Sequence, residues 1–544
     1  MLDGSSKTNI PRLLPNVLRV AAQECRDNIK LVSGKERFSY SQIDLCSDPL
    51  ARRLIASGVQ PGDRVVLGLP NSATLIIACF AIWKARAILV ALDPCIRPVN
   101  LQGILQKIAP TALIADHAFA EKLQGIPDVL DSLRAFFLND SCGGQSNLGQ
   151  ASAESLESAL QTETEPGSFP EGAEPSDATT ITFTSGSTST PKGVVHTHES
   201  LLACSSFTRD FLQLSKADVV IVPLPLHHVL AFRRFLTCVL AQCTLVLAHD
   251  IFIMKQFSET RPTGLVLVPS ACNFLIDNFS AFFRKHSGCL RYVEVGGESI
   301  SPERLAALQG LLPSAQIHIT YGLTEGRVGY LKPGPDGVFD RLESSNRGLE
   351  VKVLDGDGRP AARGQVGEIL ISGSGLFKGY WGDSNEAQDQ IRTFGFRTGD
   401  MGVVDGYGNI ELLGRMDDLV KVAGHKFSPH EIEAVLRKHP SVAEAVVIGV
   451  RKQENPESVL HAFVIPKKGA VVREAELMAF CRDRLELYKM PARIYWCTSF
   501  PKTAIGKIQR HLVAQSAEIR RDGLALVSGE GTSSQESAEQ NHRS

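Results

Sequence analysis

Apolar and polar residues follow a helical period in some stretches of the chain and form short apolar runs in others. Residues 15–25 and 40–57 have apolar positions at helical spacing. Residues 72–92 form the most apolar window, but Lys84 and Arg86 interrupt it, so we expect a buried helix and a strand rather than a membrane span. Helices in turn with strands predict layered α/β packing. We expect further strands at 62–67, 179–183, 218–222, 243–247, 263–268, 293–295 and 317–320, and a further helix at 197–212.

The later part of the chain has a different pattern. Residues 348–355 and 366–371 alternate like the strands of a small β-rich subdomain. Residues 428–431 (Ser-Pro-His-Glu) form a capping box with proline at the first helical position, which predicts a helix start. This helix, strands at 443–450 and 459–465 and a helix at 474–487 predict a compact α+β domain.

Two polar stretches interrupt these patterns. Residues 139–178 are rich in Ser, Gly, Gln and Glu, which predicts a surface insertion or flexible loop. Residues 516–544 are similarly polar and predict a disordered tail. Because 544 residues are too many for one compact core, we expect an N-terminal domain at 1–414 and a C-terminal domain at 415–515.

Composition limits the classes of partner. The formal net charge is −2, so nothing in the overall charge favours nucleic acid or an anionic membrane. The twelve cysteines form no C-x-x-C pair, and those in apolar runs are expected to be reduced core residues. No signal-peptide pattern is visible at the N-terminus, so we expect a cytoplasmic location. The cysteines expected in the core are Cys79, Cys238, Cys243 and Cys272.

The stretch with the clearest chemistry is 182–193, Thr-Phe-Thr-Ser-Gly-Ser-Thr-Ser-Thr-Pro-Lys-Gly. Its hydroxyls, its two glycines and Lys192 suit a loop that wraps a phosphate chain. A Walker-type loop is excluded because it needs glycine directly before the lysine and a hydroxyl residue directly after it, whereas Pro191 and Gly193 stand there. The remaining alternative is a Ser/Thr-rich linker.

This loop resembles the phosphate-binding loop of the adenylate-forming (AMP-binding) superfamily, and especially of acyl-CoA and aryl-CoA synthetases such as coumarate–CoA ligases. The loop departs from the family pattern at Ser189, where the family usually has glycine, and Arg86 is a second such departure. The resemblance implies a large N-terminal domain and a small mobile C-terminal domain. It also implies that the nucleotide phosphates are bound by Thr184, Ser185, Gly186, Ser187, Thr188 and Lys192.

Downstream motifs extend the resemblance over residues 15–515. Residues 224–230 (Leu-Pro-Leu-His-His-Val-Leu) place His228 at the border of the family's acyl pocket, the alternative being a hydrogen-bonded core histidine. The segment contains no Asp, which argues against an α-amino acid substrate. Arg327 is unusual for the family, and we expect it either in solvent or against a polar or anionic group of the substrate. The implied roles are Gly297 and Glu298 beside adenine, Tyr321 and Gly322 at the adenine ring, Thr324 on the α-phosphate, and Glu325 on Mg²⁺.

The last motifs concern ribose, the hinge and the acceptor. Asp400 is expected to accept the ribose hydroxyls, because a carboxylate accepts two such bonds well. By resemblance, the hinge between two domain orientations lies at Asp417, and Lys507 is the catalytic lysine of the C-terminal domain. Further nucleotide and pantetheine contacts are implied for Arg415, Lys421, Gly424 and His425.

The activity that the resemblance implies has two steps. A carboxylate attacks the α-phosphorus of ATP, with Mg²⁺ as cofactor, and coenzyme A then takes the acyl group from the adenylate. Lys192, Thr324, Glu325, His228 and Lys507 are the candidate catalytic residues. The alternatives are an adenylating enzyme that loads a carrier-protein thiol or forms an amide, and a non-catalytic nucleotide-binding relative. The identity of the acid stays open.

Overall fold

The structure is a computed structural model of the 544-residue chain. The residues that it describes are 11–26, 28–139, 153–161, 169–184, 191–248, 253–298, 300–334, 337–416, 420–422, 425–451, 458–467, 469–470, 472–502, 508–510 and 512–513.

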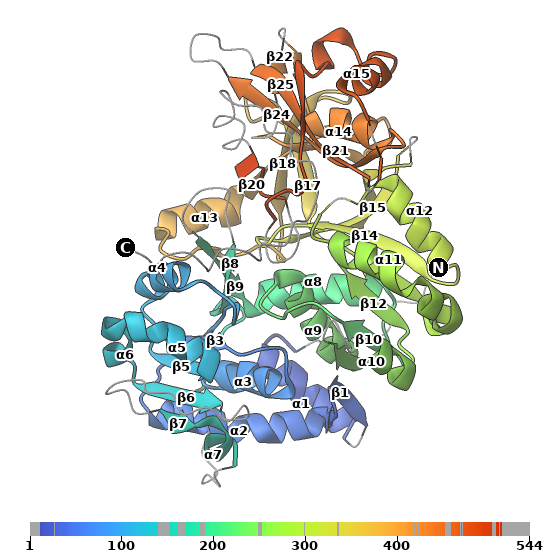
Figure 1. Ribbon diagram of the computed structural model, residues 1–544. Helices are drawn as coiled ribbons and strands as arrows, with labels where there is room; N and C mark the ends of the chain where they lie inside the picture. Colours follow the sequence, from blue (N-terminus) through green and yellow to red (C-terminus); the bar gives the residue numbers. More distant parts are fainter. Residues whose placement is uncertain are drawn as a thin grey trace, which may run out of the picture. The chain divides into compact units, whose positions relative to one another are not determined.

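The chain divides into two compact units, Met1–Met416 and Asp417–Ser544, which are described separately. The first unit is layered α/β and the second is α+β, which confirms the predicted fold class (Figure 1). Among the described helices, none is long and apolar enough to cross a bilayer. The four cysteines predicted for the core, at positions 79, 238, 243 and 272, are buried and free.

An eight-stranded sheet carries the predicted phosphate-binding segment. Four of its inner strands, β4, β3, β5 and β6, pair in parallel. They are apolar along their length because helices cover both faces of this part of the sheet. In sheet order, the strands are β19 (Gly379–Tyr380), β9 (Lys192–Thr197), β8 (Ala178–Thr184), β4 (Ile88–Ala91), β3 (Arg64–Gly68), β5 (Ala112–Asp116), β6 (Ala135–Asn139) and β7 (Glu154–Ser155).

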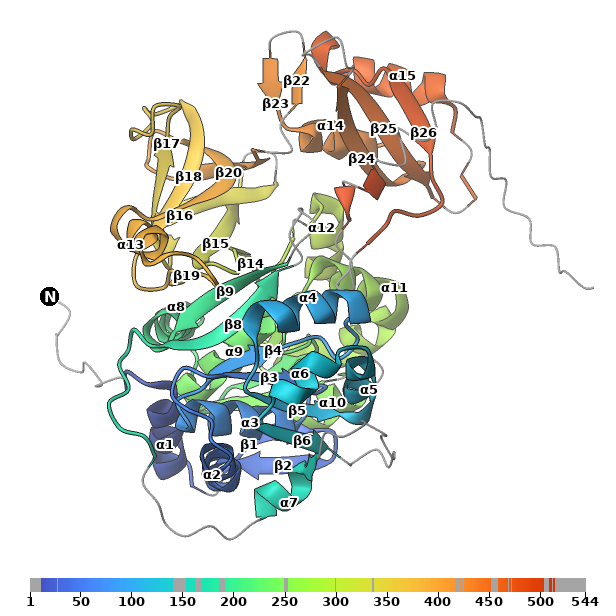
Figure 2. The ribbon, with the colours of Figure 1, turned by 90° about the vertical axis from the view of Figure 1, so that its left-hand side faces the viewer.

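A second sheet has thirteen strands. In the order of the sheet, neighbouring strands from β1 to β14 pair in parallel. Neighbouring strands from β14 through β15 to β17 pair antiparallel. The predicted β-rich subdomain is this antiparallel half, joined to the parallel half through β15 (Figure 2). In sheet order, the strands are β17 (Glu350–Leu354), β18 (Val366–Ser372), β20 (Phe396–Val404), β21 (Ile410–Arg415), β16 (Phe339–Arg347), β15 (Arg327–Pro333), β14 (Gln316–Gly322), β13 (Tyr292–Val295), β12 (Gly264–Leu267), β10 (Val219–Val222), β11 (Thr244–Leu247), β1 (Ile29–Ser33) and β2 (Glu36–Ser39).

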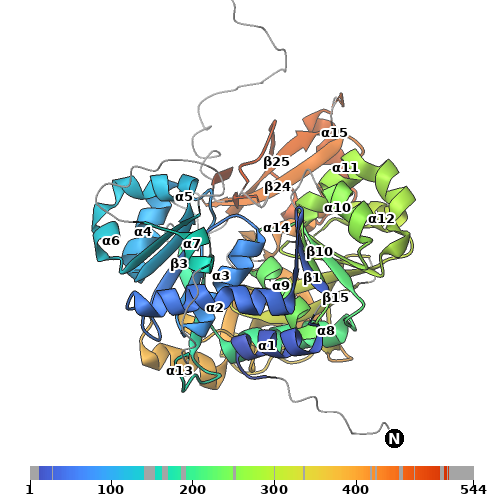
Figure 3. The same ribbon diagram turned by 90° about the horizontal axis from the view of Figure 1, so that it is seen from below.

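Helices form three layers around the two sheets, as Figure 3 shows. The central layer packs between the sheets and forms the largest apolar core. It contains α1 (Leu14–Glu24), α2 (Tyr40–Ala56), α3 (Ala73–Lys84), α8 (His198–Phe211) and α9 (Val229–Ala241). The outer layers contain α4 (Pro98–Ile108), α5 (His117–Glu121) and α6 (Pro127–Ser132) on one side, and α10 (Ile253–Thr260), α11 (Pro269–His286) and α12 (Pro302–Leu311) on the other. The short helix α13 (Asn385–Phe394) precedes β20.

The most apolar window of the sequence becomes α3 and β4, as predicted. The side chain of Lys84 is 2% exposed at the end of α3, and its Nζ lies 2.6 Å from carboxylate oxygens of Asp44 and Asp48 on α2. A buried cation needs such partners, because its desolvation is otherwise costly. The charge that argued against a membrane span is thus an internal ion pair.

The prediction of a flexible insertion at 139–178 is wrong for its middle. Residues 154–161 form β7 and the helix α7 (Leu156–Gln161). Leu156 and Ala159 are fully buried in the central core, and this contact fixes the segment despite its polar composition. Residues 140–152 and 162–168 lie outside the described part of the chain.

The second unit is built on a three-stranded sheet of β24 (Val442–Arg451), β25 (Ser458–Pro466) and β26 (Arg493–Trp496). Its helices are α14 (Pro429–Arg437) and α15 (Glu474–Arg482), and β22 (Val420–Val422) pairs with β23 (His425–Phe427). The predicted helix start at Ser428 is confirmed, but the capping box is wrong. The Ser428 hydroxyl accepts from the His430 N–H at 3.3 Å, and the Glu431 carboxylate pairs with Lys489 at 2.7 Å instead.

Candidate active site

The predicted phosphate loop connects the two strands of a hairpin. Strands β8 and β9 pair antiparallel, and Thr184 faces Lys192 where the loop joins the two strands, with the threonine Oγ1 3.5 Å from the lysine carbonyl. The sequence pattern led directly from the loop to a helix, so β9 was missed. Gly193 lies within β9, where a Cβ would come within 3.2 Å of Phe183 and Trp381, so packing explains this glycine. Ser185, Gly186, Ser187 and Thr188 lie outside the described residues.

Tyr380 contacts both Lys192, the predicted phosphate-binding lysine, and Glu325, the predicted magnesium ligand. Strand β19 adds to β9, and this pairing places the Lys192 Nζ 5.0 Å from the centre of the Tyr380 ring. The Tyr380 hydroxyl donates a 2.7 Å hydrogen bond to Glu325 Oε1. Burial and the Glu325 charge raise the pKa of Tyr380, so the phenol keeps its proton and remains a donor. Sequence reasoning assigned no role to Tyr380.

A buried arginine holds the backbone of the turn that carries Thr324 and Glu325. Arg233 on α9 is 6% exposed and donates to the carbonyls of Leu323 at 3.0 Å and Thr324 at 2.7 Å. From the other side, the Phe377 N–H donates to the Glu325 carbonyl at 2.8 Å. Both predicted catalytic residues therefore stand on a fixed backbone. Arg233 was also missed, because its partners lie about 90 residues further along the chain.

Replacing Arg233 with methionine is expected to slow acyl-adenylate formation about 10- to 100-fold, the usual cost of lost hydrogen bonds to a charged donor. The Mg²⁺ concentration for half-maximal ATP–pyrophosphate exchange should rise, because Glu325 loses its fixed position. Arg233→Lys should recover part of the rate. Arg304→Met removes an exposed arginine paired with Asp277 and serves as the control; an Arg233→Met enzyme with unchanged Mg²⁺ dependence would show that the turn does not need this contact.

Three residues predicted to contact the nucleotide lie together: Tyr321 and Arg415 both contact the carboxylate of Asp400. The Tyr321 hydroxyl donates to Asp400 Oδ2 at 2.5 Å, and Arg415 Nη1 lies 3.2 Å from Asp400 Oδ1. Arg415 also donates to the Thr398 carbonyl at 2.7 Å, which holds the guanidinium over the strand pair β20–β21. Burial and Asp400 raise the pKa of Tyr321, so its hydroxyl stays a donor.

The double glycine after β13 has two separate causes. A Cβ on Gly296 would lie 2.2 Å from Thr320 Cγ2, so the strands β13 and β14 can approach only without a side chain there. Gly297 has a φ of +91°, a backbone conformation that favours glycine. The chain thus turns sharply beside the end of β14, where Tyr321 and Gly322 lie. Glu298 follows on this turn and is half-buried.

His228 is the residue that precedes α9, and it is half-buried rather than a core residue. Asn71 fixes the segment before it, because its side chain donates to the Leu224 carbonyl at 2.9 Å and accepts from the Leu226 N–H at 2.8 Å. Burial, and then the neighbouring His227, lower the pKa of His228 to about 4. The ring is therefore neutral near pH 7.

This shift predicts a pH dependence of stability. The unfolded histidine takes up a proton near pH 6.5 and the folded one near pH 4, so between these values the unfolded state binds more protons and acid favours unfolding. His228→Gln should flatten the fall in the free energy of unfolding between pH 6.5 and 5, by at most about 1.4 kcal/mol per pH unit. Urea unfolding at pH 7 and pH 5 measures this, and equal slopes in both proteins would contradict it.

Two residues that depart from the family pattern have structural explanations. Arg86 adopts a φ of +59°, which explains why glycine suits this position, and its guanidinium donates to the carbonyls of Glu171 and Gly172. Arg327 is 4% exposed and pairs with Glu294 at 2.8 Å, so the expectation that it lies in solvent is wrong. Ser189 lies outside the described residues.

The predicted residues of the second unit are only partly described. Lys421 lies on β22 and His425 on β23, where they pair with Lys426 and Val422 respectively. Gly424 and Lys507 lie outside the described residues. Lys502 and Ile508, which flank the catalytic-lysine segment, form an antiparallel bridge, and Lys502 Nζ lies 2.9 Å from Glu444 Oε1. The chain therefore enters and leaves residues 503–507 at neighbouring points.

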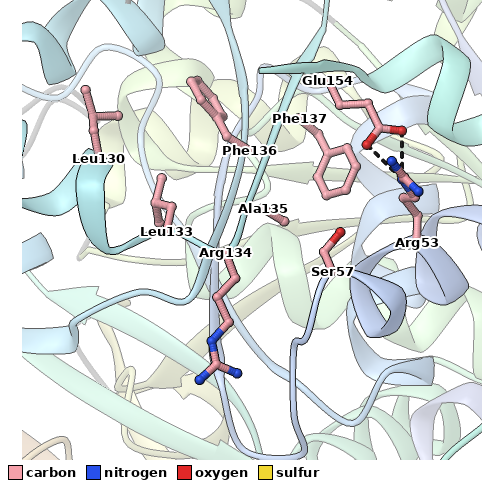
Figure 4. Close-up of a pocket in the computed structure, with 9 residues that line it drawn as sticks. All are labelled: Arg53, Ser57, Leu130, Leu133, Arg134, Ala135, Phe136, Phe137 and Glu154. Carbon is pink, nitrogen blue, oxygen red and sulfur yellow. Dashed lines mark hydrogen bonds and ion pairs between the residues drawn. The ribbon is translucent and has the colours of Figure 1, made fainter. Parts of the chain in front are cut away.

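A surface hollow of about 570 Å³ lies elsewhere in the first unit (Figure 4). Arg53 and Glu154 form an ion pair at 2.8 Å beside it. None of the predicted site residues lines this hollow, and we assign no function to it. Its lining residues are Arg53, Ser57, Leu130, Leu133, Arg134, Ala135, Phe136, Phe137 and Glu154.

Comparison with known proteins identifies the family. The model of the AMP-binding enzyme family matches residues 18–381, and that of the AMP-binding enzyme C-terminal domain matches residues 431–507. The chain belongs to the AMP-binding enzyme family. The predicted superfamily is thereby confirmed.

The relatives of this AMP-binding enzyme extend over nearly its whole length. A Humulus lupulus protein named "Probable CoA ligase CCL9" is 30% identical over 92% of this chain and 96% of its own. The oxalate–CoA ligase of Arabidopsis thaliana is 29% identical over 92% and 98%. Such full-length matches place the chain among the CoA ligases and confirm the predicted class of acid–thiol ligase. The crystal structure of ATP-bound MatB from Rhodopseudomonas palustris has the same fold, with a TM-score of 0.81, 23% identity and coverage of 93% and 99%.

Proposed function

We propose that this enzyme joins ATP and a carboxylic acid into an acyl-adenylate and then transfers the acyl group to the thiol of coenzyme A. The observation that supports this most directly is the contact chain from Lys192 through Tyr380 to Glu325. It brings the predicted phosphate-binding cation, on β9 of one sheet, next to the predicted metal-binding carboxylate, on the turn between β14 and β15 of the other. An acyl adenylation site needs both groups, because charge accumulates on the α-phosphate as pyrophosphate leaves.

The residues around Glu325 are suited to Mg²⁺ bound with a nucleotide. Mg²⁺ takes oxygen ligands and usually keeps one or two protein carboxylates, with phosphate oxygens and water completing its shell. Glu325 offers such a carboxylate, oriented by the Tyr380 hydroxyl at 2.7 Å. When bound, the ion would neutralise phosphate charge. Thr324 lies on the same fixed turn, and its hydroxyl would donate a hydrogen bond to the α-phosphate.

The other assignments follow from the second cluster. Asp400 would accept the ribose hydroxyls, while Tyr321 and the Gly297–Glu298 turn would enclose the adenine. His228, neutral at pH 7, would border the acyl group without adding charge. Lys507 would stabilise the adenylation step, and reorientation of the C-terminal domain about Asp417 would then present Gly424 and His425 to the pantetheine arm, with Arg415 and Lys421 contacting the nucleotide. We keep the prediction that the enzyme acts in the cytoplasm.

The test is carboxylate-dependent release of pyrophosphate from ATP and Mg²⁺, measured over a panel of acids with and without coenzyme A. The proposal predicts release that depends on a particular acid and turns over many times only when coenzyme A is present. A single turnover that coenzyme A cannot relieve would point to a carrier-protein thiol or an amine as acceptor. Absence of release with every acid would contradict the proposal and favour a non-catalytic role.

A further inference from the structure

Three charged side chains form a fully buried cluster between α9 and the thirteen-stranded sheet. Glu294 on β13 has no exposed surface and accepts from Arg234 on α9 and from Arg327 on β15, the latter at 2.8 Å. The Tyr330 hydroxyl also donates to Glu294, at 3.2 Å. Arg234 is 1% and Arg327 4% exposed. Such a cluster is costly to bury, so its position relative to the site is informative.

The cluster continues the surface on which the acyl group is expected. Arg234 follows Leu230 by one helical turn, so both residues lie on the same face of α9. Leu230 lies 3.2 Å from the point where a Cβ of Gly296 would stand, and Gly296 directly follows β13, two residues after Glu294. Leu230 and Gly296 therefore lie between His228 and the pair formed by Arg234 and Glu294.

The cluster contains more positive charge than Glu294 balances. Arg234 and Arg327 share this one carboxylate, and the third buried arginine, Arg233, donates to backbone carbonyls. Among the described residues, the Nε and Nη1 of Arg234 and the Nε of Arg327 have no hydrogen-bond acceptor, although all three atoms are buried. Buried guanidinium N–H groups without acceptors are unfavourable. An anion or another strong acceptor would satisfy these N–H groups.

We propose that Arg234 and Arg327 bind a second carboxylate at the far end of the substrate, so that this enzyme activates compact dicarboxylic acids. This inference rests on the proposed function, because the first carboxylate is the one that is adenylated. The second carboxylate would accept the free guanidinium N–H groups and neutralise the excess charge. An apolar chain end at the same place would leave these groups unsatisfied and would be rejected.

The experiment compares pairs of acids of matched shape. Succinate is paired with 4-methylpentanoate, and benzene-1,3-dicarboxylate with 3-isopropylbenzoate, so that a branched alkyl group replaces one carboxylate. The kcat/KM of coenzyme A-dependent pyrophosphate release should favour the dicarboxylate of at least one pair by about 10- to 100-fold, the range for a hydrogen bond to a charged group. Arg234→Met should reduce this preference to near unity or reverse it.

The matched control is Lys84→Met, which removes another buried cation, one that pairs with Asp44 and Asp48 on α2 rather than with the cluster. Both variants are expected to lower the Tm, but only Arg234→Met should change the preference between paired acids. An Arg234→Met enzyme with a lower Tm and an unchanged preference would give the cluster a purely structural role and overturn the inference. A wild-type enzyme that prefers the alkyl acids, or discriminates in neither pair, would overturn it while leaving the proposed function intact. Inactivity with every acid would overturn the proposed function itself.

Discussion

Replacing Lys507 with alanine is expected to slow acyl-adenylate formation roughly 100- to 1,000-fold, the usual effect of removing one preorganised donor from a charged transition state. The reason is that negative charge builds up on the α-phosphate and the leaving pyrophosphate, and a fixed ammonium group stabilises it. Thioester formation from a supplied acyl-adenylate should survive, because in that step no new charge develops on phosphorus. ATP–pyrophosphate exchange measures the first step, and thiol consumption with synthetic acyl-adenylate measures the second.

Lys502→Ala is the matched control for Lys507→Ala. Lys502 lies five residues earlier, at the bridge to Ile508, and its ammonium group pairs with Glu444 at 2.9 Å. An exposed pair of this kind contributes little, so the control should retain both steps and nearly the wild-type Tm. Equal loss of both steps in Lys507→Ala would rule out a role confined to adenylation.

Local patterns were sufficient to predict several elements of the fold. The apolar window at 72–92 gave α3 and β4, and the serine–proline pair at 428–429 gave the start of α14. Strand β9 was missed because its residues were taken as the end of a loop, and only pairing with β8 and β19 identifies them as a strand. The segment 154–161 was misjudged because two buried side chains outweigh its polar composition.

The residues that support the site were harder to predict than the residues that form it. Thr324 and Glu325 stand in a contiguous motif, so the resemblance to the family is enough to predict their roles. Arg233 and Tyr380 act on this motif from positions about 91 residues before and 55 residues after their partners, and no local pattern links them. Glu294 resembles any polar residue in a strand until its partners are known. Buried charges become interpretable only when the fold brings their counter-charges together.

Replacing Glu325 with glutamine is the second change expected to have a large effect. Adenylation should fall roughly 100-fold or more, because the amide keeps the shape of the side chain but loses the charge that holds the metal–nucleotide complex. The Mg²⁺ concentration for half-maximal ATP–pyrophosphate exchange should rise, while thioester formation from supplied acyl-adenylate should change little. Tyr380→Phe keeps the carboxylate and removes only its 2.7 Å hydrogen bond.

The contrast between these two variants separates charge from orientation. If Glu325 acts as a metal ligand, Glu325→Gln should shift the Mg²⁺ dependence strongly, and Tyr380→Phe should shift it in the same direction but by less, because it removes one hydrogen bond and leaves the charge of the carboxylate. If the carboxylate served only to hold Tyr380 under the Lys192 ammonium group, Glu325→Gln should have no larger effect than Tyr380→Phe, because the glutamine amide oxygen still accepts the tyrosine hydrogen bond. An unchanged Mg²⁺ dependence in Glu325→Gln would place the metal on another residue. Since Lys192 contacts the same ring, a higher KM for ATP in Tyr380→Phe would further show that this tyrosine orients the lysine as well as the carboxylate.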